Sequence, residues 1–129
     1  MLRPKALDHV GLVVSDMDRS LNFYKGLGLV LLRRSEQGAD GPSSAVLKVG
    51  DQEINVFCQP DFVPTHRDDP QRIDHFCLMM DSATIDDLVA ALREAGIAIV
   101  SGPVKRRAGA ALFVNDPDGA RVELQISIP

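Results

Sequence analysis

Apolar residues follow two patterns along this chain, and the patterns alternate in a fixed order. Residues 7–14, LDHVGLVV, form an apolar run of strand length, whereas apolar residues in 15–28 recur at helical spacing until glycines end the segment. Three more runs of strand length follow at residues 29–34, 44–50 and 52–59. The first half of the sequence therefore predicts the order β-α-β-β-β.

The same order returns in the second half. Residues 73–80, IDHFCLMM, repeat the pattern of the first strand, and 81–97 predict a helix that ends at Gly96. The remaining strand-like runs are 98–104, 110–115 and 120–128. This internal repeat predicts an α+β fold of two tandem βαβββ modules.

The length of 129 residues suits one compact domain. Within a single domain of residues 1–129, the repeat places module one at 5–59 and module two at 73–128. The segment between them, 60–72, is rich in proline and charge and predicts an extended connector.

Comparing the two modules within the chain selects candidate functional residues. His9 corresponds to His75, and Asn55 corresponds to Glu123 in the closing strands. Strand alternation places these four side chains opposite the apolar residues that must pack against the helices. We therefore expect all four to converge on the sheet face away from the helices.

Two imidazoles and one carboxylate match the ligand set that holds divalent Fe, Mn, Ni or Zn with open coordination sites. Taken singly, His9 or His75 also fits a core histidine, and Glu123 fits an exposed strand position, but their repeat-related placement favours a metal site. The adjacent Asp8 and Asp74 could orient the imidazoles, but alternation points them to the other face, which favours a strand-edge or capping role for them.

Side chains around these positions suggest where a ligand binds. Several apolar residues are expected to line the same face, and a basic run at 105–107, KRR, follows the strand at 98–104. This run fits a clamp for a carboxylate or phosphate, or alternatively a solvated charged loop. The candidate substrate-binding residues are Asn55, Phe57, Cys77, Phe113, Arg106 and Arg107.

Charge and composition narrow the classes of partner. A net charge of −4 argues against nucleic acid as a partner. The apolar runs are short and the N-terminus lacks the features of a secretion signal, which predicts a cytoplasmic protein without a membrane partner. Cys58 and Cys77 lie in apolar runs without CxxC spacing and are expected to be buried free thiols.

Four segments together resemble signature segments of the vicinal oxygen chelate superfamily, which includes glyoxalase I, bleomycin- and fosfomycin-resistance proteins, methylmalonyl-CoA epimerase and extradiol dioxygenases. The segments are LDHVGLVVSDMDRSLNFYKGLGL, GDQEINVF, IDHFCLMM and LFVNDPDGARVELQI. The resemblance implies a curved eight-stranded mixed sheet that forms a cup around a metal, with His9, His75 and Glu123 at the metal positions.

Departures from the family pattern bear on the reaction. Asn55 stands where glyoxalase I has Glu or Gln, so Glu123 is the one carboxylate at these positions that could act as a catalytic base. Phe113 stands where extradiol dioxygenases usually place Tyr, and KRRAGAA replaces the Ser-rich loop of fosfomycin transferases. The chain therefore resembles a metal-dependent lyase, isomerase or dioxygenase.

The expected substrate is a small molecule that chelates the metal through two neighbouring oxygens. The alternative is a metal-free protein that sequesters a small molecule, as the bleomycin-binding members do. The resemblance also implies a homodimer, with modules paired within one chain or exchanged between two chains.

Overall fold

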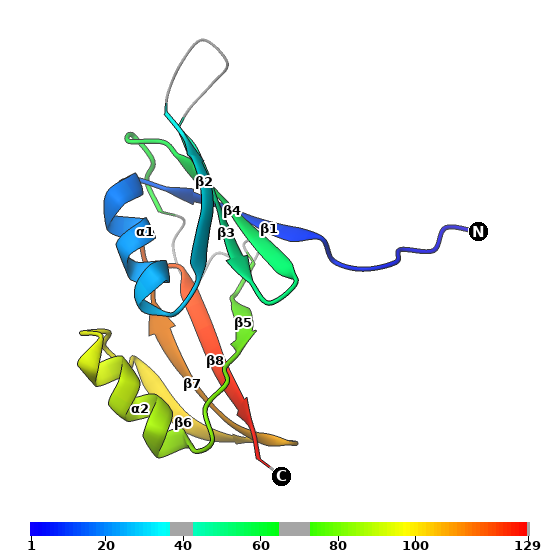
Figure 1. Ribbon diagram of the computed structural model, residues 1–129, viewed down its shortest axis with the longest axis vertical. Helices are drawn as coiled ribbons and strands as arrows, with labels where there is room; N and C mark the ends of the chain where they lie inside the picture. Colours follow the sequence, from blue (N-terminus) through cyan, green and yellow to red (C-terminus); the bar gives the residue numbers. More distant parts are fainter. Residues whose placement is uncertain (37–42, 65–72, 129) are drawn as a thin grey trace. The chain divides into compact units, whose positions relative to one another are not determined.

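The computed structural model describes residues 1–36, 43–64 and 73–128. The chain divides into two compact units, Met1–Val63 and Pro64–Pro129. Each unit contains one βαβββ module (Figure 1). The predicted α+β fold of two such modules is confirmed, with the eight strands divided between two four-stranded sheets.

The first unit follows the predicted element order. Its elements are β1 (His9–Val14), α1 (Met17–Gly26), β2 (Val30–Ser35), β3 (Ser44–Val49) and β4 (Gln52–Cys58). Asp16 caps α1, because its side chain accepts a hydrogen bond of 2.9 Å from the backbone N–H of Arg19. Gly28 leaves the helix at a positive φ of 100° that suits glycine.

The sheet of the first unit has the strand order β1-β4-β3-β2, and β1 runs parallel to β4. Alternate residues of β4, Ile54 and Val56, are buried with Tyr24 of α1 in the core. Asn55 and Phe57 therefore lie on the opposite face of the strand, as alternation predicts.

The second unit repeats this arrangement. Its elements are β5 (Phe76–Met79), α2 (Ile85–Glu94), β6 (Ser101–Arg106), β7 (Gly109–Asn115) and β8 (Arg121–Ser127). Thr84 caps α2 by accepting a 3.1 Å hydrogen bond from the N–H of Asp87. The strand order is β5-β8-β7-β6, with β5 parallel to β8. Val122, Leu124 and Ile126 of β8 are fully buried, which places Glu123 on the other face.

The boundaries of some elements differ from the predicted ones. The strand predicted at 98–104 lies at Ser101–Arg106 instead, so Arg106 is a strand residue and not part of a loop. The reason is a tight β6–β7 hairpin in which Arg106 pairs with Gly109. Residues 65–72 of the predicted connector lie outside the described residues.

Both cysteines are free, as predicted, but the prediction that they are buried was wrong. Cys77 is exposed within its unit and Cys58 is half-buried. Cys77 lies on the face of β5 opposite the buried Leu78, where the unit's own helix does not cover it.

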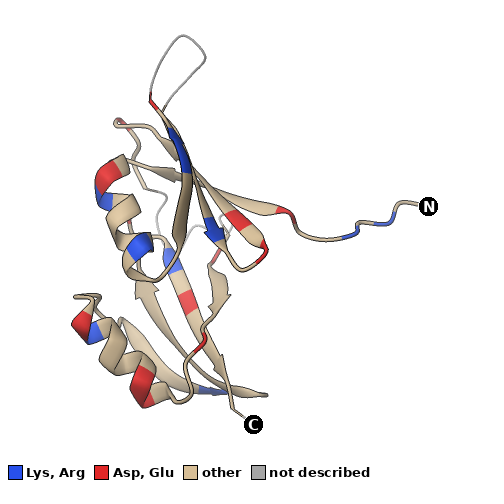
Figure 2. Cartoon of the chain, viewed as in Figure 1, with Lys and Arg blue, Asp and Glu red and all other residues tan. Residues whose placement is uncertain are grey.

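Charged residues are arranged to favour both helices. Figure 2 shows acidic and basic residues on each, with Asp18 in the first turn and Lys25 in the last turn of α1. In α2, Asp86 and Asp87 occupy the first turn and Arg93 the last. These signs complement the helix dipole. No helix in the described parts of the chain is long and apolar enough to cross a membrane.

Candidate functional site

The second unit brings His75 and Glu123 together. His75 immediately precedes β5, and Glu123 lies opposite Cys77 in the parallel pairing of β5 with β8. The Nε2 atom of His75 lies 3.6 Å from Oε2 of Glu123. Two of the three metal ligands predicted from the repeat are therefore neighbours on the sheet face away from the core.

Glu123 is a buried carboxylate with a cationic partner. Its side chain is 8% exposed, and Arg106 donates hydrogen bonds from Nε, at 3.0 Å, and from Nη2 to the single oxygen Oε1. Burial by itself raises the pKa of Glu123, but hydrogen bonds from Arg106 and Cys77 and the charges of Arg106 and His75 bring the pKa below its ordinary value. The carboxylate is therefore ionised at neutral pH, and Oε2 is the oxygen that faces His75.

The aspartate that precedes each histidine orients its ring. Oδ2 of Asp74 lies 2.6 Å from Nδ1 of His75, and Oδ2 of Asp8 lies 2.8 Å from Nδ1 of His9. Both aspartates lie just before the first residue of their strand, at the strand edge as predicted, but alternation does not hold there, and their side chains contact the imidazoles instead of pointing to the other face. Each pair leaves Nε2 of the imidazole for a further ligand.

His9 and Asn55 belong to the first unit, and their predicted meeting with His75 and Glu123 stays a prediction. Within that unit His9 lies opposite Glu53 of β4, and Asn55 lies opposite Gly11 of β1. The Oδ1 atom of Asn55 is buried without a hydrogen-bond partner among the residues that the structure describes. Phe57 is 39% exposed on the same face.

The His75–Glu123 pair fits two ligands of one metal ion. A nitrogen and an oxygen, each about 2.1 Å from a tetrahedral ion, lie roughly 3.4 Å apart, close to the observed separation. The described residues contain no group of three or more His, Cys, Asp or Glu side chains that could hold a metal ion. The pair therefore needs at least one further ligand from elsewhere.

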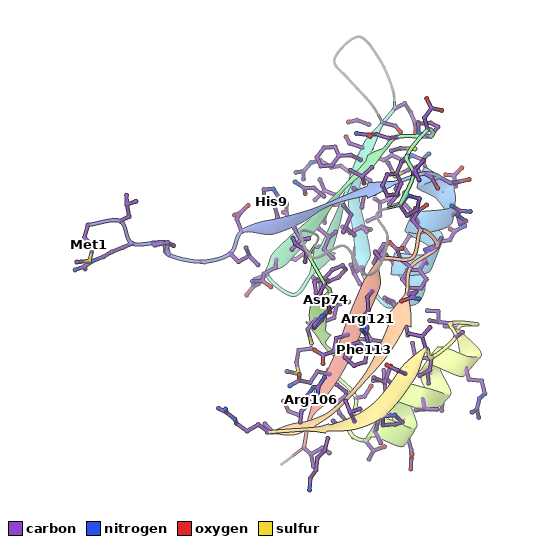
Figure 3. The ribbon with its side chains drawn as sticks, turned by 180° about the vertical axis from the view of Figure 1, so that it is seen from behind. Met1, His9, Asp74, Arg106, Phe113 and Arg121 are labelled. Atoms are coloured by element: carbon purple, nitrogen blue, oxygen red, sulfur yellow. The ribbon has the colours of Figure 1, made fainter. Side chains whose placement is uncertain are left out.

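Phe113 lies at the centre of the polar cluster in the second unit. Its ring is 7% exposed, and the His75 ring meets it edge-on at 5.7 Å between centroids. The guanidinium carbon of Arg121 lies 4.2 Å from the ring centroid and that of Arg106 lies 5.8 Å from it (Figure 3). Phe113 therefore supports charged groups more than it offers open apolar surface.

The turn before β8 fixes the register of this strand. Oδ1 of the buried Asp116 accepts hydrogen bonds from the N–H groups of Asp118, at 2.9 Å, and Ala120, at 2.8 Å. The N–H of Asp116 in turn donates to the Ala120 carbonyl at 2.8 Å. These bonds determine which residues of β8 lie opposite β7 and hence where Glu123 points.

The sequence analysis did not select Arg121 as a site residue, and it did not predict that Arg106 contacts Glu123. Arg121 shares a face with Glu123, two residues away in the same strand, so alternation alone could have selected it. The Arg106–Glu123 contact spans β7 and depends on the irregular register between Ser101 and Val104, which the sequence does not display. Arg107 lies in the turn after β6.

Cys77 is expected to be an unreactive thiol although it is exposed. Partial burial of its sulfur, a hydrogen bond to Glu123 and the negative charge of Glu123 raise the pKa of Cys77 to about 12. At pH 8 the loss of thiolate outweighs the greater nucleophilicity of a more basic thiol, which gives alkylation on the order of 50-fold slower than for an ordinary thiol. Iodoacetamide labelling of metal-free protein, followed by mass spectrometry, measures this rate.

The same chain unfolded in urea is the internal control, and Glu123→Gln should accelerate labelling of the folded protein by removing a negative charge. Equal labelling rates for Cys77 in folded and unfolded protein would contradict the raised pKa.

The fold and this face define a class of protein: two βαβββ modules, the second of which presents a buried carboxylate and an oriented imidazole on the sheet face away from its core. The family model of the Glyoxalase/Bleomycin resistance protein/Dioxygenase superfamily matches residues 6–124. The chain belongs to this superfamily, which confirms the resemblance seen in the sequence.

Individual relatives agree with this assignment. The chain is 32% identical to virulence protein STM3117 of Salmonella typhimurium over 92% of its own length and 81% of the relative's. It is 31% identical to a lactoylglutathione lyase of the same organism, over 90% of this chain and 88% of that protein. The crystal structure of a glyoxalase family protein from Enterococcus faecalis superimposes with a TM-score of 0.79 at 27% identity, covering 94% of this chain and 97% of that one.

Proposed function

We propose that this protein is a metal-dependent, glyoxalase-like lyase or isomerase whose metal ligands are His9, His75 and Glu123. Its substrate is a small molecule that chelates the ion through two neighbouring oxygens. The observation that carries the proposal is the 3.6 Å approach of His75 Nε2 to Glu123 Oε2, with the opposite nitrogen of the ring held by Asp74. Divalent metals are commonly used in this superfamily.

Each candidate site residue has a distinct role in the proposed reaction. A divalent ion held by these ligands would polarise the chelating oxygens of the substrate and make a neighbouring C–H more acidic. Arg106 donates its hydrogen bonds to Oε1 of Glu123 and leaves Oε2 available to bind the metal ion. The lowered pKa of Glu123 suits a ligand better than a strong base at neutral pH. Asn55, with its buried and unpaired Oδ1, would accept a hydrogen bond from a substrate hydroxyl.

Two observations favour a lyase or isomerase over a dioxygenase. Relatives about 31% identical over most of their length bear the name lactoylglutathione lyase. Phe113 contributes no hydroxyl to hold a catecholate, and its ring is already covered by Arg106, Arg121 and His75. A dioxygenase reaction nevertheless belongs in the activity screen because the same three ligands suit iron.

A metal-free small-molecule binding protein is the second candidate. The Arg106–Glu123 contact favours it, because the carboxylate already has a cationic partner and needs no ion to compensate its burial. The Asn at position 55, a poor metal ligand, also suits this function.

Metal analysis separates the two candidates. The protein is purified without chelator or nickel resin, and its Fe, Mn, Ni and Zn contents are measured per chain. About one tightly bound ion per chain, with activity toward hemithioacetals, acyl-CoA epimers or catechols after reconstitution, would support the enzyme. Absence of any metal affinity in titrations with all four ions would overturn the enzyme and leave the binding protein.

Asp74→Asn is expected to weaken metal binding about 10- to 100-fold, because an amide polarises the imidazole less than a carboxylate does. Asp8→Asn should have an effect of similar size through His9. Calorimetric titration of metal-free protein with Zn²⁺ measures both. Asp81→Asn, an exposed aspartate just after β5, is the matched control and should leave the affinity unchanged. An unchanged affinity in Asp74→Asn would contradict the proposal that Asp74 supports metal binding through His75.

We further propose that the protein is a homodimer, and complementation tests how its sites are built. His9→Ala and Glu123→Gln each damage a different module. If a site combines module one of one chain with module two of another, co-refolding the two inactive variants restores one intact site per mixed dimer. If both modules of a site come from one chain, the mixture stays inactive.

A further inference from the structure

We infer that Arg121 binds an oxyanion of the substrate, a carboxylate or a phosphate, beside the Glu123 carboxylate. The inference rests on the proposed function in one respect: it requires the face that carries Glu123 to be the face that receives the ligand. It goes further by specifying the charge of the substrate and the residue that recognises it.

Arg121 lies on the ligand face by its position in β8. It precedes Glu123 by two residues, so both side chains lie opposite the buried Val122 and Leu124. Arg121 pairs across the sheet with Asn115, whereas Arg106 pairs with Gly109 at the other end of β7. The two arginines therefore flank Phe113 along the sheet (Figure 3).

The two guanidinium groups differ in their partners. Arg106 is paired with the carboxylate of Glu123. Arg121 is half-buried, and its contacts within the described residues are the Phe113 ring at 4.2 Å and the Ser101 hydroxyl, to which Nη2 donates at 3.5 Å. Among those residues no carboxylate neutralises it.

Stacking on Phe113 prepares Arg121 for an oxyanion. A guanidinium held over an aromatic ring keeps its N–H groups in a plane that is offset from the ring, so these donors stay available at its edge. A carboxylate or phosphate accepts two parallel hydrogen bonds from such an edge. Because the ring restricts the side chain before binding, less conformational entropy is lost when the anion binds.

The charges of the cluster also favour an anion. Arg106 and Arg121 carry two positive charges beside the Phe113 ring, Glu123 compensates that of Arg106, and the carboxylate of Asp74 is directed to His75 Nδ1. Glu123 compensates the charge of Arg106, so Arg121 supplies the uncompensated charge that attracts an anion. Replacing Glu123 by Gln should therefore strengthen anion binding at this face, although it weakens metal binding.

The experiment titrates metal-free protein with inorganic phosphate and, separately, with acetate, at constant ionic strength. The Nε–H signal of Arg121, assigned by its loss in Arg121→Gln, is followed by NMR together with the backbone signals of β8. We expect saturable binding of at least one of the two anions. The affinity should be at least about tenfold lower in Arg121→Gln. It should be a few-fold lower in Arg121→Lys, which keeps the positive charge but cannot donate two parallel hydrogen bonds to one anion. The tighter of the two anions identifies the substrate group as a phosphate or a carboxylate.

Arg93→Gln removes the same charge from the last turn of α2 and should bind as the wild type does. Glu123→Gln should bind a few-fold more tightly. Equal affinities in Arg121→Gln and Arg93→Gln, absence of saturable binding, or an unchanged affinity in Glu123→Gln would each overturn the inference. Thermal unfolding tests whether each variant is folded. If Arg121→Gln is not folded, Arg121→Lys is compared with the wild type instead.

Failure of this inference and failure of the proposed function give different results. Anion binding through Arg121 in a protein without metal affinity would contradict the proposed metal-dependent activity and support the anion site. Metal binding with activity, but no effect of Arg121→Gln on anion affinity, would support the proposed metal-dependent activity and contradict the anion site.

Discussion

Glu123→Gln should lower the affinity for a divalent metal by at least about 100-fold. The substitution keeps the size of the side chain and removes the charged oxygen that faces His75 Nε2 at 3.6 Å. Loss of a direct ligand should exceed the 10- to 100-fold effects typical of groups that only orient ligands. Calorimetric titration of metal-free protein with Zn²⁺ or Mn²⁺ measures the affinity.

Glu94→Gln makes the same chemical change at the exposed end of α2 and should bind the ion as the wild type does. The fold should tolerate Glu123→Gln, because Arg106 can still donate to the amide oxygen. Wild-type affinity in a folded Glu123→Gln variant would mean that the ion, if it binds, is held elsewhere.

Arg106→Gln is expected to destabilise the metal-free protein by about 2 to 3 kcal/mol at pH 7. Truncating one partner of a buried ion pair leaves the other charge uncompensated, which costs roughly 3 to 5 kcal/mol when both groups are buried. Arg106 is 38% exposed, so we expect a smaller effect. Urea unfolding at pH 7 measures the difference in the free energy of unfolding.

The sign of the pH dependence follows from the lowered pKa of Glu123. Its contribution to stability is present above the unfolded pKa, about 4.3, and is lost as the pH falls through the folded value. The difference between wild type and Arg106→Gln should therefore shrink at pH 3.5. Adding Glu123→Gln to Arg106→Gln should restore part of the stability, because no buried charge remains unpaired. Arg107→Gln, an exposed neighbour, should change stability by less than about 0.5 kcal/mol.

The internal repeat explains why the meeting of His75 and Glu123 could be predicted from the sequence. The repeat matched His75 with His9 and Glu123 with Asn55, and alternation around the fully buried Leu124 gave the face of Glu123. The parallel pairing of β5 with β8, which brings the two residues together, was not predicted and is seen only in the structure. The same reasoning placed Asn55 on the corresponding face of β4.

Contacts that depend on where a strand begins could not be predicted in this way. Asp74 was assigned to the wrong face because the apolar run suggested a strand from residue 73, whereas β5 begins at Phe76. Arg106 was placed beyond the end of its strand, because the sequence gives no sign that the β6–β7 hairpin turns only after it. In both cases the side chain lies just outside the apolar run that marks the strand in the sequence, and it makes the contact that orients a site residue.

The hydrogen-bonded turn at Asp116 limits how this protein can be redesigned. Shifting β8 by one residue would exchange Glu123 for a core side chain such as Leu124, so a library that changes the length of this turn would lose both the core and the site. Randomising Ser101 and Arg121, which contact each other and are not partners of Glu123, leaves that spacing intact. New ligand preferences are therefore best sought by substitution on the open face, with the length of residues 116–120 kept constant.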